Sequence, residues 1–110
     1  NNIGNGGLSL RKVNTFISIL QNRKSEPLIQ LYMDKLVTDS FYNEDAFWGI
    51  EGPLLYKSFN KPSLKEALAF AFEQNPSIAY QINNFNLPFG CHAFDVHETT
   101  FWKAFIPFLQ

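Results

Sequence analysis

The sequence predicts a helix-rich α+β protein with a few short strands. Helix is indicated because apolar residues recur at three- and four-residue spacing in several segments, most of them beside a start or stop signal. Strand is indicated mainly by one short alternation of apolar and polar residues near the beginning of the chain. Because so few strands cannot build an independent sheet of any size, we expect a fragment whose main sheet lies elsewhere.

The first third of the chain predicts one strand and two helices. Leucines alternate with polar residues over positions 8–11, which is typical of a short half-buried strand. A helix is then expected up to about Asn22, with an apolar stripe formed by Val13, Phe16, Ile17 and Leu20. Pro27 suits the first turn of a second helix. Its expected buried face contains Leu28, Leu31, Tyr32 and Leu36.

Capping residues mark two further helix starts. Asn43 is a good N-cap, and Glu44 and Asp45 then lie in the first turn, where the helix dipole favours them. The stretch that follows is expected to be short or irregular because of Gly49, Gly52 and Pro53. Ser63 and Glu66 have the spacing of a capping box. They precede a helical stripe formed by Leu64, Ala67, Leu68 and Ala71.

The last third is expected to be mostly irregular. Residues 75–92 contain several proline, asparagine and glycine residues, so we predict a loop with short strands there. A last helix is expected around Phe101, Trp102 and Phe105, and Pro107 should terminate it.

Composition limits the class of protein. The chain has 110 residues, of which 45% are hydrophobic and twelve are phenylalanine, which is typical of one packed domain. The net charge is −1 and the basic residues are scattered, so no nucleic-acid partner is expected. No apolar run is long enough for a transmembrane segment. A single cysteine, Cys91, favours a reducing, cytoplasmic compartment.

The first stretch that could carry chemistry is "IGNGGLSLRK", residues 3–12. Glycine supplies a positive φ cheaply, so Asn5, Gly6 and Gly7 fit a plain tight turn. They also fit a backbone that lies against a ligand, where a side chain would collide. The glycines alone favour the turn.

The second stretch is "NEDAFWG", residues 43–49. Glu44 and Asp45 point about 100° apart on a helix, so both cannot face one atom. They fit two acids that decorate a helix N-terminus, or one that serves a site while the other orients it. Trp48 beside a carboxylate suits sugar recognition, because the ring covers a C–H face and the acid accepts hydroxyl hydrogen bonds. The aromatic residues equally fit a core.

The third stretch is "PFGCHAFDVH", residues 88–97. His92 and His97 are five residues apart, which is not the helical spacing of a metal pair. A hydrogen-bonded structural role suits His92 equally well. Cys91 as the nucleophile of a hydrolase is disfavoured, because adjacent side chains diverge and His92 cannot easily serve as its base.

Taken in order, "IGNGGLSLRK", "NEDAFWG" and "LPFGCHAF…FW" resemble the C-terminal half of a bacterial family of glycosyltransferases of the GT-A type, a conserved domain of unknown function. The resemblance spans nearly the whole chain. It implies that residues 1–110 are a single acceptor-side domain, cut from a larger catalytic domain whose nucleotide-binding half lies upstream. The chain has no initiator methionine and no Asp-x-Asp signature, and it shows no alternating β-α-β pattern, in keeping with that expectation.

The resemblance also implies roles for particular residues. Asn5, Gly6 and Gly7 would line the cleft, and Trp48 would contact the sugar. Asp45 would be the catalytic base with Glu44 nearby, although the order could be reversed. His92 would be a ligand of a divalent metal, Mn²⁺ or Mg²⁺, in the full-length parent.

The implied partners are a nucleotide-sugar donor and a glycan acceptor of a bacterial surface polysaccharide, with the fragment inactive alone. The alternative is a non-enzymatic carbohydrate-binding or protein-interaction module, with exposed aromatic residues as its surface. Dimerisation of the fragment is a further expectation, because a strand without its sheet can pair with a second copy.

Overall fold

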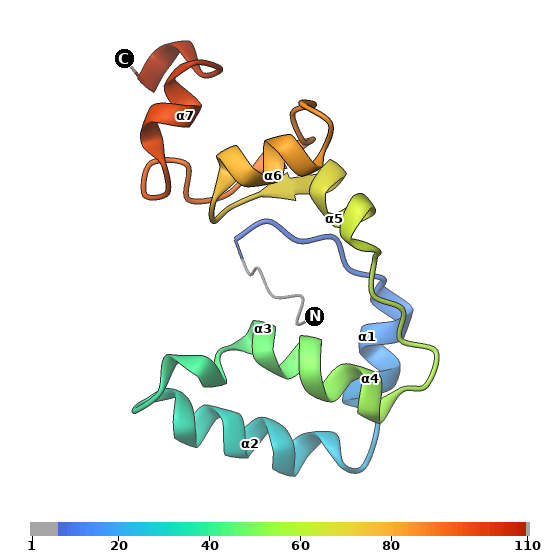
Figure 1. Cartoon of the computed structure of the whole chain (residues 1–110). Helices are drawn as coiled ribbons and strands as arrows, with labels where there is room; N and C mark the ends of the chain where they lie inside the picture. The colour runs from blue at the N-terminus through green and yellow to red at the C-terminus, as the bar shows by residue number, and fades with distance from the viewer. Residues whose placement is uncertain (1–6, 110) are drawn as a thin grey trace. The chain divides into compact units, whose positions relative to one another are not determined.

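The computed structural model describes residues 7–109, which divide into two compact units (Figure 1). The N-terminal unit extends to Lys61, and the C-terminal unit begins at Pro62. Both are rich in helix, and the C-terminal unit contains two short strands, so the predicted α+β class is confirmed. That the whole chain is one part of a larger catalytic domain stays a prediction.

The N-terminal unit is a set of short helices. It contains α1 (Val13–Leu20), α2 (Ser25–Leu36), the 3-10 turn η1 (Ser40–Tyr42), α3 (Glu44–Ala46), the π-helical segment η2 (Phe47–Glu51) and α4 (Gly52–Leu55). The last three follow one another without a break, and α2 runs alongside them (Figure 1). Gly52 is buried in this run, where an added Cβ would lie 3.1 Å from Cε2 of Phe59.

The core of this unit takes one large side chain from each of three segments: Ile19 of α1, Tyr32 of α2 and Phe47 of η2. The rings of Tyr32 and Phe47 meet edge to face at 5.6 Å, which is a favoured aromatic geometry. The turn between α1 and α2 is fixed by buried Ser25, whose hydroxyl donates to the carbonyl of Ile19. This packing holds η2, which continues directly from α3, against α2.

The C-terminal unit contains a small parallel β-α-β arrangement. Its elements are α5 (Leu64–Phe70), β1 (Ala71–Phe72), α6 (Pro76–Ile82), β2 (Gly90–Cys91), α7 (Thr99–Lys103) and the 3-10 turn η3 (Pro107–Leu109). β1 and β2 are parallel, with Ala71 opposite Gly90 and Phe72 opposite Cys91. The core is formed by Phe72, Ala79 and Trp102.

Several predicted elements are confirmed. Asn43 caps α3 by accepting from the backbone N–H of Ala46 at 3.1 Å, and Ser63 and Glu66 form the capping box of α5. Pro27 lies in the first turn of α2. Of the buried face predicted for this helix, Tyr32 is buried, whereas Leu31 and Leu36 are exposed.

Other predictions are wrong, each for a physical reason. Residues 8–11 form no strand, since among the described residues only β1 and β2 pair. Residues 76–82 are helix α6, because Pro76 at the first helical position is preorganised for a helix start. The last helix ends at Lys103, before Phe105, whereas the stretch after Asp45 is irregular as predicted, with the π-helical segment η2 between α3 and the short α4.

Candidate functional site

The acidic pair lies where the sequence placed it, at the N-terminus of a helix. Asn43 has an extended backbone and caps the first turn, so Glu44 and Asp45 are the first two residues of α3. The dipole of the helical run that continues to Leu55 favours negative charge at this end. The local sequence alone therefore fixes the position of both carboxylates.

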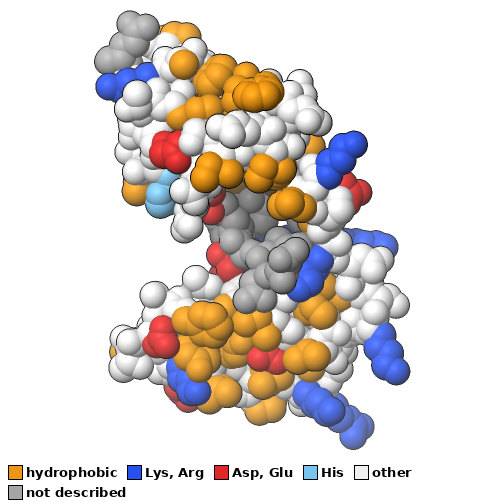
Figure 2. Space-filling model, in the orientation of Figure 1, with side chains coloured by type: hydrophobic (Ala, Val, Ile, Leu, Met, Phe, Trp, Pro, Cys, Tyr) orange, Lys and Arg blue, Asp and Glu red, His pale blue; other side chains and the backbone are white. Residues whose placement is uncertain are grey.

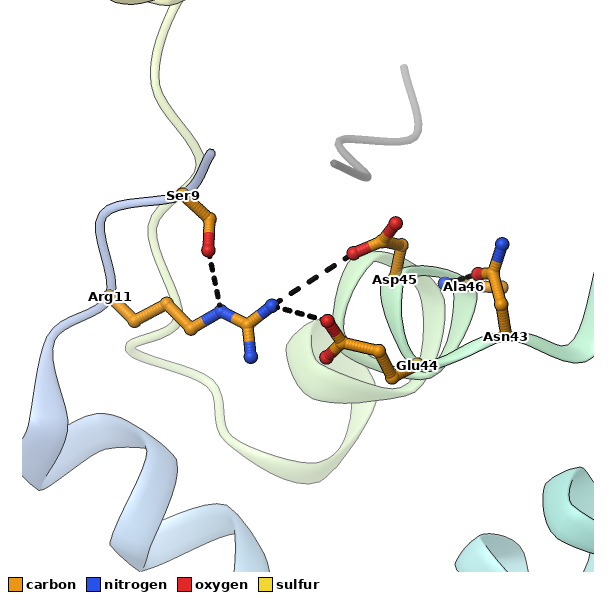
Figure 3. A network of polar contacts seen from close by, with 6 residues as sticks. All are labelled: Ser9, Arg11, Asn43, Glu44, Asp45 and Ala46. Atoms are coloured by element: carbon orange, nitrogen blue, oxygen red, sulfur yellow. Dashed lines mark hydrogen bonds and ion pairs between the residues drawn. The ribbon is translucent and has the colours of Figure 1, made fainter. Parts of the chain in front are cut away.

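Arg11 joins the two acids to a segment far away in the sequence (Figure 3). Its Nη2 donates to Oε1 of Glu44 at 2.7 Å and lies 3.9 Å from Oδ1 of Asp45. Its Nε donates to Oγ of Ser9 at 3.1 Å. The guanidinium therefore contacts Glu44 closely and Asp45 only at the limit of an ion pair.

The two carboxylates differ in their environment. The hydrogen bond from Arg11 lowers the pKa of Glu44, opposed by partial desolvation and aided by smaller contributions from Trp48 and Asp45. The side chain of Glu44 is 53% exposed, whereas that of Asp45 is 21% exposed. Glu44 is thus held ionised as the partner of Arg11, while the less exposed Asp45 stands beside that pair.

Aromatic side chains continue from this cluster. The Arg11 guanidinium carbon lies 5.6 Å from the ring centre of Phe16, within the range of a cation–π contact. The ring of Phe16 lies 4.1 Å from Trp48, and Trp48 meets Phe47 edge to face at 5.1 Å. Trp48 therefore also packs against the core, as the alternative interpretation of its aromatic stretch predicted.

An open hollow of about 230 Å³ adjoins the cluster within the N-terminal unit. Its surface is almost wholly apolar, although Asn43 and Glu44 are among the residues that line it. The other lining residues are Leu20, Ile29, Tyr32, Met33, Leu36, Tyr42, Phe47 and Trp48. Glu44 thus belongs both to the ion pair and to the residues that line the hollow.

Of the three residues of the glycine-rich stretch that were predicted to line a cleft, only Gly7 is among the described residues. Asn5 and Gly6 lie outside the described residues, and Gly7 is exposed in a bend. Among the glycines that the structure describes, none has a positive φ, so Gly7 does not need to be glycine for that reason. A role of this stretch in lining a cleft stays a prediction.

His92 lies in the C-terminal unit, directly after β2. Its Nδ1 is 3.2 Å from Oε1 of Glu73, which follows β1. That His92 and the acidic pair serve one sugar-transfer site, as the resemblance implies, stays a prediction. Cys91 beside it is partly buried, and burial raises the pKa of its thiol, which disfavours a nucleophilic thiolate.

A metal would have to draw most of its ligands from elsewhere. Residues 7–109 contain no group of three or more histidine, cysteine, aspartate or glutamate side chains that could hold an ion. His92 nevertheless fits as a single ligand, because a metal-bound imidazole commonly engages a carboxylate through its other nitrogen.

Two residues, one in each unit, contact a predicted functional residue without themselves being predicted from the sequence. Arg11 is 33 positions from Glu44, and Glu73 is 19 positions from His92. The sequence signal for both is weak, since scattered charged residues of this kind usually lie on a solvated face. Pairing depends on the tertiary packing that brings the segments together.

The fold and these contacts define a helix-rich α+β protein with an acid–arginine cluster at a helix start, next to an aromatic hollow. The chain belongs to a family described as "Protein of unknown function (DUF5672)", whose sequence model matches residues 1–92. Comparisons with curated proteins and with solved structures found no match. In the described part of the chain, no helix is both long and apolar enough to cross a membrane.

Proposed function

We propose that the chain is the acceptor-side part of a metal-dependent glycosyltransferase, which moves a sugar from a nucleotide-sugar donor to a glycan acceptor. The observation that carries this proposal is the acidic pair at the start of α3, held by Arg11 and bordered by Trp48 and the hollow. A carboxylate beside an aromatic ring is chemistry that suits a sugar. The likeness of three sequence stretches to GT-A enzymes supports the same conclusion.

In this proposal the two acids have different roles. An attacking hydroxyl must lose its proton as it reaches the anomeric carbon, and a positioned carboxylate can accept that proton. Asp45 takes this role, because Glu44 is committed to the 2.7 Å contact with Arg11. Glu44 accepts from Arg11 and offers its remaining lone pairs to acceptor hydroxyls at the edge of the hollow.

In this proposal the donor-binding half would lie in a larger parent protein, in keeping with the sequence of this chain, which has no Asp-x-Asp signature. Mn²⁺ or Mg²⁺ would neutralise the departing diphosphate there, and His92 would supply one ligand. Imidazole suits Mn²⁺ better than Mg²⁺. The chain alone would then bind an acceptor without transferring sugar to it, as part of bacterial, cytoplasmic polysaccharide synthesis.

A second candidate is a non-enzymatic carbohydrate-binding or protein-interaction module. It is favoured by the many large hydrophobic side chains that are exposed, among them Leu36 and Met33 at the hollow. Figure 2 shows such side chains gathered in patches on the face in view of each unit. A binding module would need the aromatic residues and a carboxylate, but no base.

The test is calorimetric titration with a panel of oligosaccharides, followed by a transfer assay with the full-length parent, nucleotide sugars and Mn²⁺. Asp45→Asn should leave oligosaccharide binding within about twofold and abolish transfer. Asp34→Asn is the matched control. Asp34 lies at an exposed position of α2, where its Oδ1 accepts a hydrogen bond from Nε2 of Gln30 at 2.7 Å. Unchanged transfer in Asp45→Asn would refute the base assignment, and binding without transfer by the wild-type parent would support the module.

A further inference from the structure

The hollow of the N-terminal unit is almost wholly apolar, although several residues that line it carry polar atoms. Most of these atoms are engaged elsewhere. The hydroxyl of Tyr32 donates to Oε1 of Glu51 at 3.0 Å, and the hydroxyl of Tyr42 accepts from Nζ of Lys35 at 3.2 Å. Oδ1 of Asn43 caps α3 by accepting from a backbone N–H at 3.1 Å. The hollow therefore offers a ligand mainly rings and hydrocarbon, where sugar hydroxyls would be left without partners.

The hollow has room for an apolar group and exposes apolar side chains that such a group would cover. Its volume is about 230 Å³, and an apolar cavity of about 150 Å³ is large enough for one benzene molecule. Leu20 of α1 and Met33 and Leu36 of α2 line it and are exposed. Because removing apolar surface from water is favourable in proportion to its area, a phenyl or short alkyl group would bind here.

One charged side chain, Glu44, belongs to the lining. It is held ionised by Arg11 at 2.7 Å and is half exposed. An ionised carboxylate accepts about four hydrogen bonds, so acceptor sites remain beyond the one that Arg11 uses. Arg11 already balances the charge of Glu44, and Asp45 adds a second acid beside the pair, so a negatively charged ligand would be repelled. The group that fits beside Glu44 is a neutral hydroxyl.

We propose that the hollow binds an amphipathic glycoside, with an alkyl or phenyl aglycone among the apolar side chains and a sugar hydroxyl donating to Glu44. The apolar group supplies the affinity, and the hydroxyl fixes the orientation. This inference deepens the proposed function by naming the substrate class, and it rests on that function only for calling the glycoside an acceptor. The acceptor is then a glycoside with an apolar aglycone, which binds more tightly than a free oligosaccharide.

The test is ¹H–¹⁵N titration of the chain with hexyl glucoside, below its micelle concentration, and with methyl glucoside. Hexyl glucoside should bind at least about tenfold more tightly, because each fully buried methylene group is worth about fourfold in affinity. It should shift the indole signal of Trp48, which lines the hollow, and leave that of buried Trp102 unchanged. Hexyl glucoside that binds no more tightly than methyl glucoside would overturn the proposal. Hexanol that binds as tightly as hexyl glucoside would also overturn it, because the sugar would then contribute nothing.

Two leucines of α2 provide a matched pair of variants. Leu36 lines the hollow and is 46% exposed, whereas Leu31 is 42% exposed and is not part of the lining. Leu36→Gln should lower the affinity for hexyl glucoside about fivefold and leave that for methyl glucoside unchanged, and Leu31→Gln should change neither. Equal losses in the two variants would overturn the proposal. A dimer that Leu36→Gln weakens, with no glycoside bound, would instead assign the hollow to a second copy of the chain.

The titration needs neither donor nor metal, so its outcome is separate from that of the proposed function. If hexyl glucoside binds but the full-length parent transfers no sugar to any acceptor, the proposed function fails and the glycoside site stands. If the parent transfers sugar to free oligosaccharides and the chain shows no preference for hexyl glucoside, this inference alone fails.

Discussion

The ion pair between Arg11 and Glu44 can be measured by a double-mutant cycle with Arg11→Ala and Glu44→Gln. Removing Arg11 should destabilise the N-terminal unit, because its guanidinium contacts Glu44 at 2.7 Å and lies 5.6 Å from the centre of the Phe16 ring. Glu44→Gln keeps the shape of the side chain and removes only its charge. The cycle therefore separates the pair from the packing of either side chain.

The expected coupling free energy follows from the solvent exposure of the two side chains. The side chains of Arg11 and Glu44 are 33% and 53% exposed, so solvent screens their interaction. Exposed ion pairs contribute about 0.2–1 kcal/mol, and the short distance favours a coupling of about 0.5 kcal/mol. The contact with Phe16 contributes a further ~0.5 kcal/mol, which appears in Arg11→Ala alone. The single Arg11→Ala variant should therefore lose about 1 kcal/mol.

The assay is urea unfolding at neutral pH, followed by the indole ¹H–¹⁵N signal of Trp48, which reports the N-terminal unit. Because the folded-state pKa of Glu44 is lowered, its contribution is present above the unfolded value of about 4.3. It is lost as the pH falls through the folded-state pKa. Coupling within about 0.2 kcal/mol of zero at neutral pH, or coupling that survives about 1 M salt, would refute the reasoning.

Three further predictions concern the core, a tyrosine and the cysteine. Ile19→Val should destabilise the N-terminal unit by about 1 kcal/mol, whereas Ile17→Val, at an exposed position of the same helix, should cost less than about 0.5 kcal/mol. Equal losses of unfolding free energy in urea would show that the buried face of α1 is wrongly assigned. Burial and the hydrogen bond to Glu51 raise the pKa of Tyr32 to about 12, so its stabilising contribution is complete below about pH 10 and is lost as the pH rises through 12. Ultraviolet titration of Glu51→Ala, which removes the acceptor, should show a lower pKa for Tyr32, and an unchanged value would exclude a contribution of Glu51. Iodoacetamide should alkylate Cys91 more slowly than free cysteine at neutral pH, and a rate equal to that of free cysteine would show that burial does not raise the pKa of this thiol.

Features that depend on residues close together in the sequence, such as helix caps, are predicted best. The caps of α3 and α5 are set by a side chain and a backbone three residues apart, so Asn43 and the Ser63–Glu66 pair were predictable. The acidic pair is located correctly for the same reason. Of the residues proposed as functional, these two acids depend least on the rest of the fold.

The features that were not predicted from the sequence depend on tertiary packing. Helix α1 has apolar residues on more than one face, so periodicity alone favours a stripe through Ile17, while packing against α2 buries Ile19. The two-residue strands β1 and β2 are too short to show an alternating pattern. The contacts of Arg11 with Glu44 and of Glu73 with His92 join segments that only the fold brings together.

The most direct test of the proposed acceptor site uses the two tryptophans of the chain. Trp48 lines the hollow, whereas Trp102 is buried in the core of the C-terminal unit, so each gives a separate indole signal in a ¹H–¹⁵N spectrum. Titration with soluble oligosaccharides should shift the Trp48 signal and leave that of Trp102 unchanged. Glu44→Gln should weaken the response, because the acceptor hydroxyls lose a charged partner. Oligosaccharides that shift neither signal, or both alike, would contradict a sugar site at the start of α3.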